Sequence, residues 1–266
     1  MREFRRTISR AGLFISQLIY PKTFLGEFRT FEEAQLKSGI KWHYSTDQEI
    51  LENYNQISTD EKTVKLLYMF ESKRYSVQRF NFLPTLLAGM NIREIHILDI
   101  GSGWSDIGKI IELTVNNSHP KVTHYDLPFY AKIAHQNPKN FPNLNFIEKI
   151  EDAKNIDLVY FGSSIQYFND YKSILRECVQ LNPRYIVISD STFSNSKTFC
   201  TLQKNMSKRV IPRWIFQEQE LSALMKENGY SKNLETENFS PRWNLKGSGI
   251  KIQLFQKNLV YKRNLI

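Results

Sequence analysis

The sequence predicts an α/β fold, in which a doubly wound, mostly parallel sheet of seven strands follows an N-terminal helical extension. Short apolar runs alternate with segments of helical periodicity between residues 95 and 190, and this alternation is typical of β-α-β units. A glycine turn closes the first apolar run, as expected where a strand passes into a helix close to a ligand. The length of 266 residues suits one such domain with an appended segment.

Five of the expected strands are short apolar runs, and helical segments separate most of them. The runs occupy residues 95–100, 121–125, 144–147, 157–161 and 184–189. A last strand is expected at residues 250–255, where apolar and polar residues alternate, and a weaker one at residues 234–239. Helices are expected at residues 105–113, 129–136, 171–180 and 218–228, the last of them capped by Gly229.

The change in patterning divides the chain into a helical extension, residues 1–90, and a Rossmann-like domain, residues 91–266. Within the extension, apolar residues recur at three- and four-residue spacing between Phe4 and Leu18, beside a separate row of arginines. This basic amphipathic pattern leaves two interpretations open. Residues 1–20 either contact a membrane surface peripherally, or pack on the domain or on the partner subunit of a homodimer.

Charge, cysteine content and the length of apolar runs limit the binding partners and the cellular location that we expect. The 36 Lys and Arg against 27 Asp and Glu give a formal charge of +9, which favours acidic partners or reflects a Lys- and Asn-rich background. The two cysteines form neither a disulfide framework nor a zinc pattern, and no metal is expected. No apolar run reaches the roughly 18 residues of a transmembrane helix. We therefore expect a cytoplasmic protein, with the inner membrane surface as an option.

Ligand chemistry is expected just after each strand, because open α/β sheets bind ligands outside the carboxyl ends of their strands. The first strand ends in Asp99-Ile100-Gly101-Ser102-Gly103-Trp104. Glycines in such a turn let a ligand approach the backbone closely. Dinucleotide-binding turns carry a third glycine where this chain has Asp106, whose carboxylate would repel a pyrophosphate. Asp99 suits instead the ammonium group of a methionine-derived cofactor.

The second and third strands end in residues that suit an adenosine ligand. Asp126, followed by Leu127, is placed to accept both ribose hydroxyls, or else to cap the next helix. Ile150 lies among acidic residues where an adenine amino group is expected, although solvated loop charge also explains most of those acids. With the glycine turn, these residues predict S-adenosylmethionine (SAM) as the cofactor, ahead of a nicotinamide dinucleotide.

The fourth strand leads into Phe161-Gly162-Ser163-Ser164-Ile165-Gln166-Tyr167. The first three of these are expected to bind the cofactor, with Gly162 leaving room for its methionine part. Gln166 is expected to face the substrate and Tyr167 to take part in catalysis, or both pack against the following helix. The Asn/Asp-Pro-Pro-Tyr signature of amino-directed DNA methyltransferases is absent from this position, which argues against a nucleic acid partner.

The fifth strand ends at Asp190, where a base that activates an acceptor is expected if burial raises its pKa; a structural hydrogen bond is the alternative. None of the five histidines follows the fourth strand, so a carboxylate or a tyrosine is the candidate base. Arg209, Arg213 and Trp214 are expected to hold a sugar-linked phosphate, because a guanidinium pairs bidentately with phosphate. A solvated basic loop is the other interpretation.

These motifs, in this order, resemble a bacterial family of class I SAM-dependent methyltransferases that is often encoded with surface-polysaccharide genes. The resemblance covers about residues 24–230. Its matching blocks are residues 26–34, 98–103, 162–168, 201–203 and 213–216. The chain departs from the family at Ser189-Asp190, where Asp-Arg is usual, at Ser102, where glycine is usual, and at Asp126, where glutamate is usual.

The resemblance implies methyl transfer from SAM, directed to an oxygen of a glycan or glycan precursor in surface polysaccharide biosynthesis. The substrate expected is therefore a sugar or a glycan-linked small molecule. An alternative is a catalytically degenerate SAM- or nucleotide-binding protein that assembles a polysaccharide complex. A nicotinamide oxidoreductase is less favoured, because the third glycine of its turn is missing.

Overall fold

The computed structural model describes ten stretches of the chain. They are residues 24–38, 82–90, 94–103, 107–115, 118–136, 138–139, 141–204, 210–237, 252 and 254–264. The chain forms two compact units: unit 1 comprises residues 1–42, 192–220 and 237–256, and unit 2 comprises residues 43–191, 221–236 and 257–266. Neither unit is bounded at residue 90, and the predicted domain division there stays a prediction. The expected helix of residues 1–20 lies outside the described stretches.

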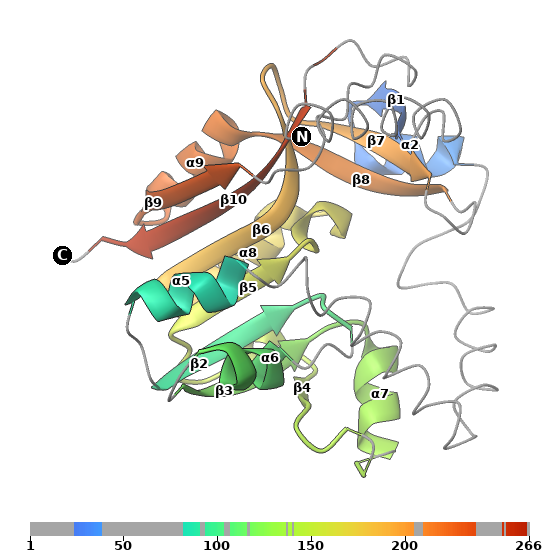
Figure 1. The fold of residues 1–266 in the computed structure, drawn as a ribbon. Helices are drawn as coiled ribbons and strands as arrows, with labels where there is room; N and C mark the ends of the chain where they lie inside the picture. The colour runs from blue at the N-terminus through green and yellow to red at the C-terminus, as the bar shows by residue number, and fades with distance from the viewer. Residues whose placement is uncertain are drawn as a thin grey trace, which may run out of the picture. The chain divides into compact units, whose positions relative to one another are not determined.

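Unit 2 is built on a mixed, mostly parallel sheet with the strand order β4-β3-β2-β5-β6-β10-β9. The strands are β2 (Glu94–Ile100), β3 (His119–Tyr125), β4 (Asn145–Ile147), β5 (Leu158–Gly162), β6 (Tyr185–Ser194), β9 (Tyr230–Glu237) and β10 (Leu254–Arg263). The first five in the spatial order pair in parallel. Figure 1 shows β10 running opposite to β9. The order and directions confirm the predicted doubly wound, Rossmann-like α/β fold.

The sheet reverses its winding direction between β2 and β5. From β2 the chain winds outward through β3 and β4, and then returns to place β5 on the other side of β2. Asp99 of β2 lies beside both His124 of β3 and Tyr160 of β5 in the parallel register. In sheets of this kind a ligand binds at such a switch point, outside the carboxyl ends of the strands.

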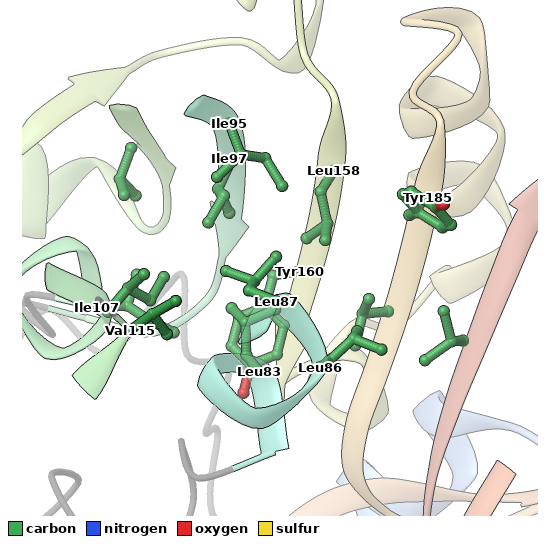
Figure 2. Packing of buried hydrophobic residues seen from close by; sticks show 14 residues of the cluster. Leu83, Leu86, Leu87, Ile95, Ile97, Ile107, Val115, Leu158, Tyr160 and Tyr185 are labelled. Atoms are coloured by element: carbon green, nitrogen blue, oxygen red, sulfur yellow. The ribbon is translucent and has the colours of Figure 1, made fainter. Parts of the chain in front are cut away.

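One face of this sheet packs against two helices, α5 (Phe82–Met90) and α6 (Ile107–Thr114). Leu83 and Leu87 of α5 are fully buried, and Figure 2 shows them facing Tyr160. Alternate strand residues complete this core from β2, β5 and β6: Ile95, Ile97, Leu158, Tyr160, Tyr185 and Val187. The period of two follows from the pleat, which sends successive side chains to opposite faces.

The opposite face is buried as well. Its strand residues include Leu98, Ile100, Val159, Phe161, Ile186 and Ile188, all with an exposed fraction of 0%. A sheet covered on both faces needs largely apolar strands, which explains why β5 and the first half of β6 are recognisable in the sequence as hydrophobic runs.

Three further helices belong wholly or mainly to unit 2: α7 (Pro128–Gln136), α8 (Tyr171–Gln180) and α9 (Glu218–Glu227). The Asp170 side chain caps α8 by accepting a hydrogen bond from the Ser173 amide. Gly229 follows α9 with a φ of +83°, and its amide donates to the Lys226 carbonyl, which confirms the predicted C-terminal cap. Within the described part of the chain, no helix combines the length and apolar content that crossing a membrane requires.

Unit 1 contains a small sheet in which β1 (Phe24–Phe28), β7 (Phe199–Lys204) and β8 (Val210–Gln217) pair antiparallel in that order. Helix α2 (Phe31–Lys37) contacts β7 and β8, and its first turn is capped by Thr30, whose hydroxyl accepts from the Glu33 amide. The expectation that residues 1–90 are helical and irregular is therefore wrong for β1. Strands β7 and β8 were not predicted either, because polar and charged residues interrupt their apolar pattern.

Two predicted strands lie at shifted positions. The last strand is Leu254–Arg263 rather than residues 250–255, because the buried run Leu259, Val260 and Tyr261 lies beyond the alternating segment. Strand β9 is Tyr230–Glu237 rather than residues 234–239. Only Tyr230 of β9 is buried, so most of this edge strand lacks an apolar signal.

Candidate functional site

The glycine turn after β2 is tied to the end of β3. Gly101 and Gly103 have φ angles of +75° and +67°, a region that side chains disfavour. The Gly101 amide donates to the Tyr125 carbonyl at 2.9 Å, and the Gly103 amide donates to Asp126 Oδ2 at 2.6 Å. The loops that follow β2 and β3 are therefore joined by two hydrogen bonds, both donated by glycine amides of this turn.

Asp126 is the carboxylate at the centre of this arrangement. It accepts the Gly103 amide through Oδ2 and the Leu127 amide through Oδ1, the latter at 2.7 Å. The residue is half-buried, and desolvation raises its pKa to about 6, although both amides oppose the shift. A carboxylate oxygen has two lone pairs. Each oxygen can thus accept one more hydrogen bond, as a ligand with adjacent hydroxyl groups would require.

Asp99 forms a buried pair with a residue that the sequence did not single out, His124. The exposed fractions of Asp99 and His124 are 1% and 2%, and Nδ1 of His124 lies 3.4 Å from Oδ2 of Asp99. The Ser102 hydroxyl donates to the other carboxylate oxygen of Asp99. The signal for His124 is its register, because Asp99 and His124 are direct neighbours on adjacent strands. Asp99 therefore anchors the glycine turn through Ser102.

The loop after β5 has its own internal framework. Ser163 adopts a φ of +60°, unusual for a residue with a side chain, and its amide donates to the Ser189 carbonyl at 2.9 Å. Gln166 is fully buried; its Nε2 donates to the Ser163 carbonyl at 2.7 Å, and its Oε1 accepts from the Ser191 hydroxyl at 3.0 Å. These bonds all go to protein groups, and the substrate contact predicted for Gln166 stays a prediction. Tyr167 follows it half-buried.

Gly162 and Gly101 are both needed for close packing. A Cβ on Gly162 would lie 2.7 Å from the Tyr160 ring, and one on Gly101 would lie 2.7 Å from Ser164 Cβ. The Ser164 hydroxyl donates to the Ile100 carbonyl and joins the ends of β2 and β5. The space beside Gly162 thus holds the Tyr160 ring, and its predicted role of leaving room for a cofactor stays a prediction.

Asp190 lies at the carboxyl end of the β5–β6 ladder, which ends with Gly162 opposite Ser189. It is the least buried residue of β6 and has a φ of +52°. Its backbone amide donates to Asn258 Oδ1 at 2.8 Å, and the Ser189 hydroxyl donates to the same oxygen at 2.8 Å. Asn258, on β10, belongs to a region where sequence analysis found no site signal.

The remaining predicted cofactor residues have mixed positions. Leu127 is half-buried directly after Asp126, Ile150 is buried at the start of a 3₁₀ turn (Ile150–Asp152), and Phe161 is fully buried within β5. Trp104 lies outside the described residues, as does Arg209 among the predicted substrate residues. The structure therefore places Asp99, the glycine turn and Asp126 together. For all of the predicted cofactor residues, contact with a cofactor stays a prediction.

Arg213 and Trp214 belong to unit 1 and contact other residues of that unit. Arg213 is 5% exposed; its Nη1 donates to Gln203 Oε1 and its Nη2 to Thr192 Oγ1, both at 2.9 Å. Its guanidinium also lies 5.2 Å from the ring centroid of Phe24. The Trp214 ring packs 6.3 Å from Phe31 of α2, measured between ring centroids. A phosphate contact for these two residues stays a prediction.

The chemistry available in unit 2 is that of acids, amides and hydroxyls. Among the described residues, no group of three or more His, Cys, Asp or Glu side chains has an arrangement that could hold a metal ion. The half-buried carboxylate of Asp126 directly follows β3, and Asp190 lies within β6, just past the end of its ladder with β5. In α/β sheets ligands bind outside the carboxyl ends of the parallel strands.

Comparison with known proteins found no matching family model and no matching curated protein. Solved structures do match. A SAM-dependent methyltransferase from Methanosarcina mazei has a TM-score of 0.48 at 13% identity, with 68% of this chain and 98% of that chain covered. A second, from Clostridium acetobutylicum, has a TM-score of 0.47 at 10% identity and coverages of 76% and 98%. The Burkholderia thailandensis 1,6-didemethyltoxoflavin-N1-methyltransferase, bound to S-adenosylhomocysteine, has a TM-score of 0.47 at 14% identity and coverages of 70% and 79%.

Proposed function

We propose that this protein is a SAM-dependent methyltransferase of class I. One observation carries the proposal: Asp126, a half-buried carboxylate directly after β3, accepts the amide of Gly103 and so joins the loops that follow β2 and β3, beside the switch point of the sheet. An acidic residue at this position of a Rossmann-like sheet typically accepts ribose hydroxyls. Asp126 retains one acceptor site on each oxygen for that purpose.

The residues at the turn fit SAM better than a dinucleotide. The Gly101 and Gly103 amides already donate to Tyr125 and Asp126, so they are not directed at a pyrophosphate. In this proposal Asp99, which is 1% exposed, holds Ser102 and the turn in place, and its contact with the ammonium group of the cofactor stays a prediction. The cofactor residues proposed are Gly101, Ser102, Gly103, Asp126 and Leu127.

The acceptor is proposed to be a hydroxyl group of a glycan or glycan precursor, in line with the resemblance to polysaccharide-associated methyltransferases. When bound, SAM supplies an electrophilic methyl group. Asp190 would take the proton of the acceptor hydroxyl onto its carboxylate, and the half-buried Tyr167 would help to orient the acceptor. A cytoplasmic location, where nucleotide-linked sugars are made, belongs to the same proposal.

Isothermal calorimetry with SAM tests the cofactor claim. We expect wild-type protein to bind SAM, and Asp126→Ala to weaken binding at least tenfold, because the ribose hydroxyls would lose their charged acceptor. Asp157→Asn is a matched control, since this exposed aspartate lies before β5, at the other end of the sheet, where it accepts the His96 amide. The absence of SAM binding to folded wild-type protein would overturn the proposal.

Turnover separates the enzyme from a degenerate binding protein. Incubation with methyl-labelled SAM and a panel of nucleotide sugars should transfer label in a way that Asp190→Asn reduces at least a hundredfold. SAM binding at normal affinity with no transfer to any sugar would favour the binding-protein alternative.

NADH fluorescence titration checks the oxidoreductase alternative, for which we expect no saturable signal.

A further inference from the structure

Asp190, within β6, has a backbone conformation that residues with a side chain disfavour, although aspartate tolerates it better than most. Its φ of +52° lies in the left-handed region, where a Cβ crowds the following carbonyl group. Ser163, across the ladder at the end of β5, is also left-handed. Two neighbouring strand ends therefore carry unfavourable backbone conformations, and such conformations persist only where surrounding groups enforce them.

Asn258 supplies the enforcing contact on one side. Its Oδ1 accepts two hydrogen bonds, from the Asp190 amide and from the Ser189 hydroxyl, each at 2.8 Å. Its Nδ2 donates to the Thr236 hydroxyl of β9 at 2.9 Å, which fixes the orientation of the amide. The exposed fraction of Asn258 is 2%, so water does not replace these partners. The hydrogen bond to this buried oxygen stabilises the backbone conformation in which the Asp190 amide points toward Asn258 of β10.

Gln166 supplies the contact on the other side. Its fully buried side-chain amide bonds the Ser163 carbonyl and the Ser191 hydroxyl. Gln166 therefore links the residue after β5 to the residue that follows Asp190 in β6. The two amides bracket Asp190, whose side chain is the most accessible in its strand. A fully satisfied buried network of this kind specifies a single local conformation.

We propose that Asn258 is a positioning residue that holds Asp190 in its left-handed conformation and so aims the carboxyl group out of the sheet toward the acceptor. The catalytic use of Asp190 rests on the proposed function, but its placement by Asn258 does not. Asn258 acts through the backbone of Asp190 and touches neither cofactor nor acceptor in this proposal. It adds to the site a residue from the last strand of the sheet.

Carboxyl carbon NMR reads the placement directly, without cofactor or substrate. In protein labelled with ¹³C-aspartate, Asp190→Asn assigns the resonance of Asp190. We expect Asn258→Ala to change the chemical shift of that resonance, because the Asp190 backbone loses the acceptor of its amide. Thr236→Val is the matched control, because it removes the partner of Nδ2 and leaves Oδ1 in place. It should lower the melting temperature and move the Asp190 resonance less than Asn258→Ala does, because the accepting oxygen is retained.

Asn258→Asp keeps an accepting oxygen and guards against a variant that does not fold; it should retain the wild-type shift of Asp190 better than Asn258→Ala does. A second readout is thermal. Asn258→Ala should lower the melting temperature less in an Asp190→Gly background, because glycine adopts a positive φ without help.

An unchanged Asp190 resonance in folded Asn258→Ala, or equal melting-temperature losses in both backgrounds, would overturn the proposal. Neither result bears on whether SAM binds. Calorimetry that finds no SAM binding would overturn the proposed function and leave the positioning claim standing on the NMR data.

Discussion

Asp126 illustrates at the residue scale how a buried carboxyl group lowers the stability of the fold that contains it. Desolvation of its carboxyl raises the pKa to about 6, against about 4 for an unfolded aspartate. The cost arises because the ionised form loses hydration that two amide hydrogen bonds do not fully replace. A ligand that donates two further hydroxyl groups would restore part of that lost solvation.

The raised pKa predicts a pH-dependent stability. Below pH 4 the carboxyl is protonated in both folded and unfolded states, and its stabilising contribution is fully present. As the pH rises through 6 that contribution is lost, because the unfolded state releases its proton first. The free energy of unfolding of Asp126→Asn, relative to wild type, should therefore rise by about 2–3 kcal/mol between pH 4 and pH 7. Urea unfolding at each pH measures this difference; a constant difference would contradict the shifted pKa.

The left-handed conformation of Asp190 predicts that glycine at this position gives a more stable protein than alanine does, while either substitution abolishes methyl transfer. Asp190→Gly should be more stable than Asp190→Ala by about 1 kcal/mol, because only glycine accepts a φ of +52° without strain. Both variants should lose methyl transfer. Asn182 is a matched control with a φ of +53° on an exposed loop. There the same pair of substitutions should differ by a similar free energy and leave transfer unchanged. Equal stability of the two Asp190 variants would remove the argument from strain.

At the scale of elements, the strand ends at the switch point are joined by contacts that need glycine. Two features of Gly101 exclude a side chain. Its φ is positive, at +75°, and a Cβ added there would lie only 2.7 Å from Ser164 Cβ. Gly229, after α9, has a positive φ of +83°, but a Cβ added there would meet nothing within 4 Å. Gly89, within α5, has neither constraint. Gly101 thus combines backbone strain with steric crowding, Gly229 has the strain alone, and Gly89 has neither, so substitutions at the three positions can distinguish the two effects.

Alanine substitutions at these positions should give a graded result. We expect Gly229→Ala to cost about 1 kcal/mol through backbone strain alone. Gly101→Ala should cost about 2–4 kcal/mol, because crowding against Ser164 adds to the strain. Gly89→Ala should stabilise the protein by about 0.5–1 kcal/mol through helix propensity. Guanidinium unfolding measures all three, and a cost at Gly101 no larger than at Gly229 would show that the β2–β5 contact yields easily.

At the scale of the whole molecule, the chain divides its described residues between two compact units with different chemistry. The proposed cofactor residues and Asp190 all belong to unit 2. Unit 1 buries Arg213, a permanently charged side chain, against Gln203, Thr192 and Phe24. Each of these partners comes from a different strand, so the guanidinium joins β8 to β7, β6 and β1.

Arg213→Met tests whether this residue serves the fold. Methionine matches much of the volume but leaves the Gln203 and Thr192 oxygens without their donors, and we expect a loss of about 3 kcal/mol in the free energy of unfolding. Glu27→Gln, which removes a surface ion pair with Lys197 in the same unit, should cost about 0–1 kcal/mol. SAM affinity at a temperature well below melting should be unchanged in both. A stable Arg213→Met variant that loses only sugar-phosphate binding would favour the substrate role instead.

The parts of this fold that the sequence predicted are those whose signal is local. An apolar run closed by glycines identifies β2, and Gly229 marks the end of α9, because each of these features acts over a few neighbouring residues. Strands β1, β7 and β8 escaped prediction, since their stability depends on pairing with one another across long stretches of chain. Polar residues within β7 and β8, such as Gln203 and Arg213, are satisfied only by partners that the sequence does not reveal.

The candidate site divides in the same way. The sequence by itself determined the glycine turn, the acids Asp99, Asp126 and Asp190, and their places at strand ends, because residue type and strand period act locally. Only the tertiary structure decided that Gly103 donates to Asp126, that Asp99 is buried beside His124, and that Asn258 holds the Asp190 backbone. The physical reason is that register and strand order bring together site residues up to 69 positions apart, and burial then raises the pKa of Asp126.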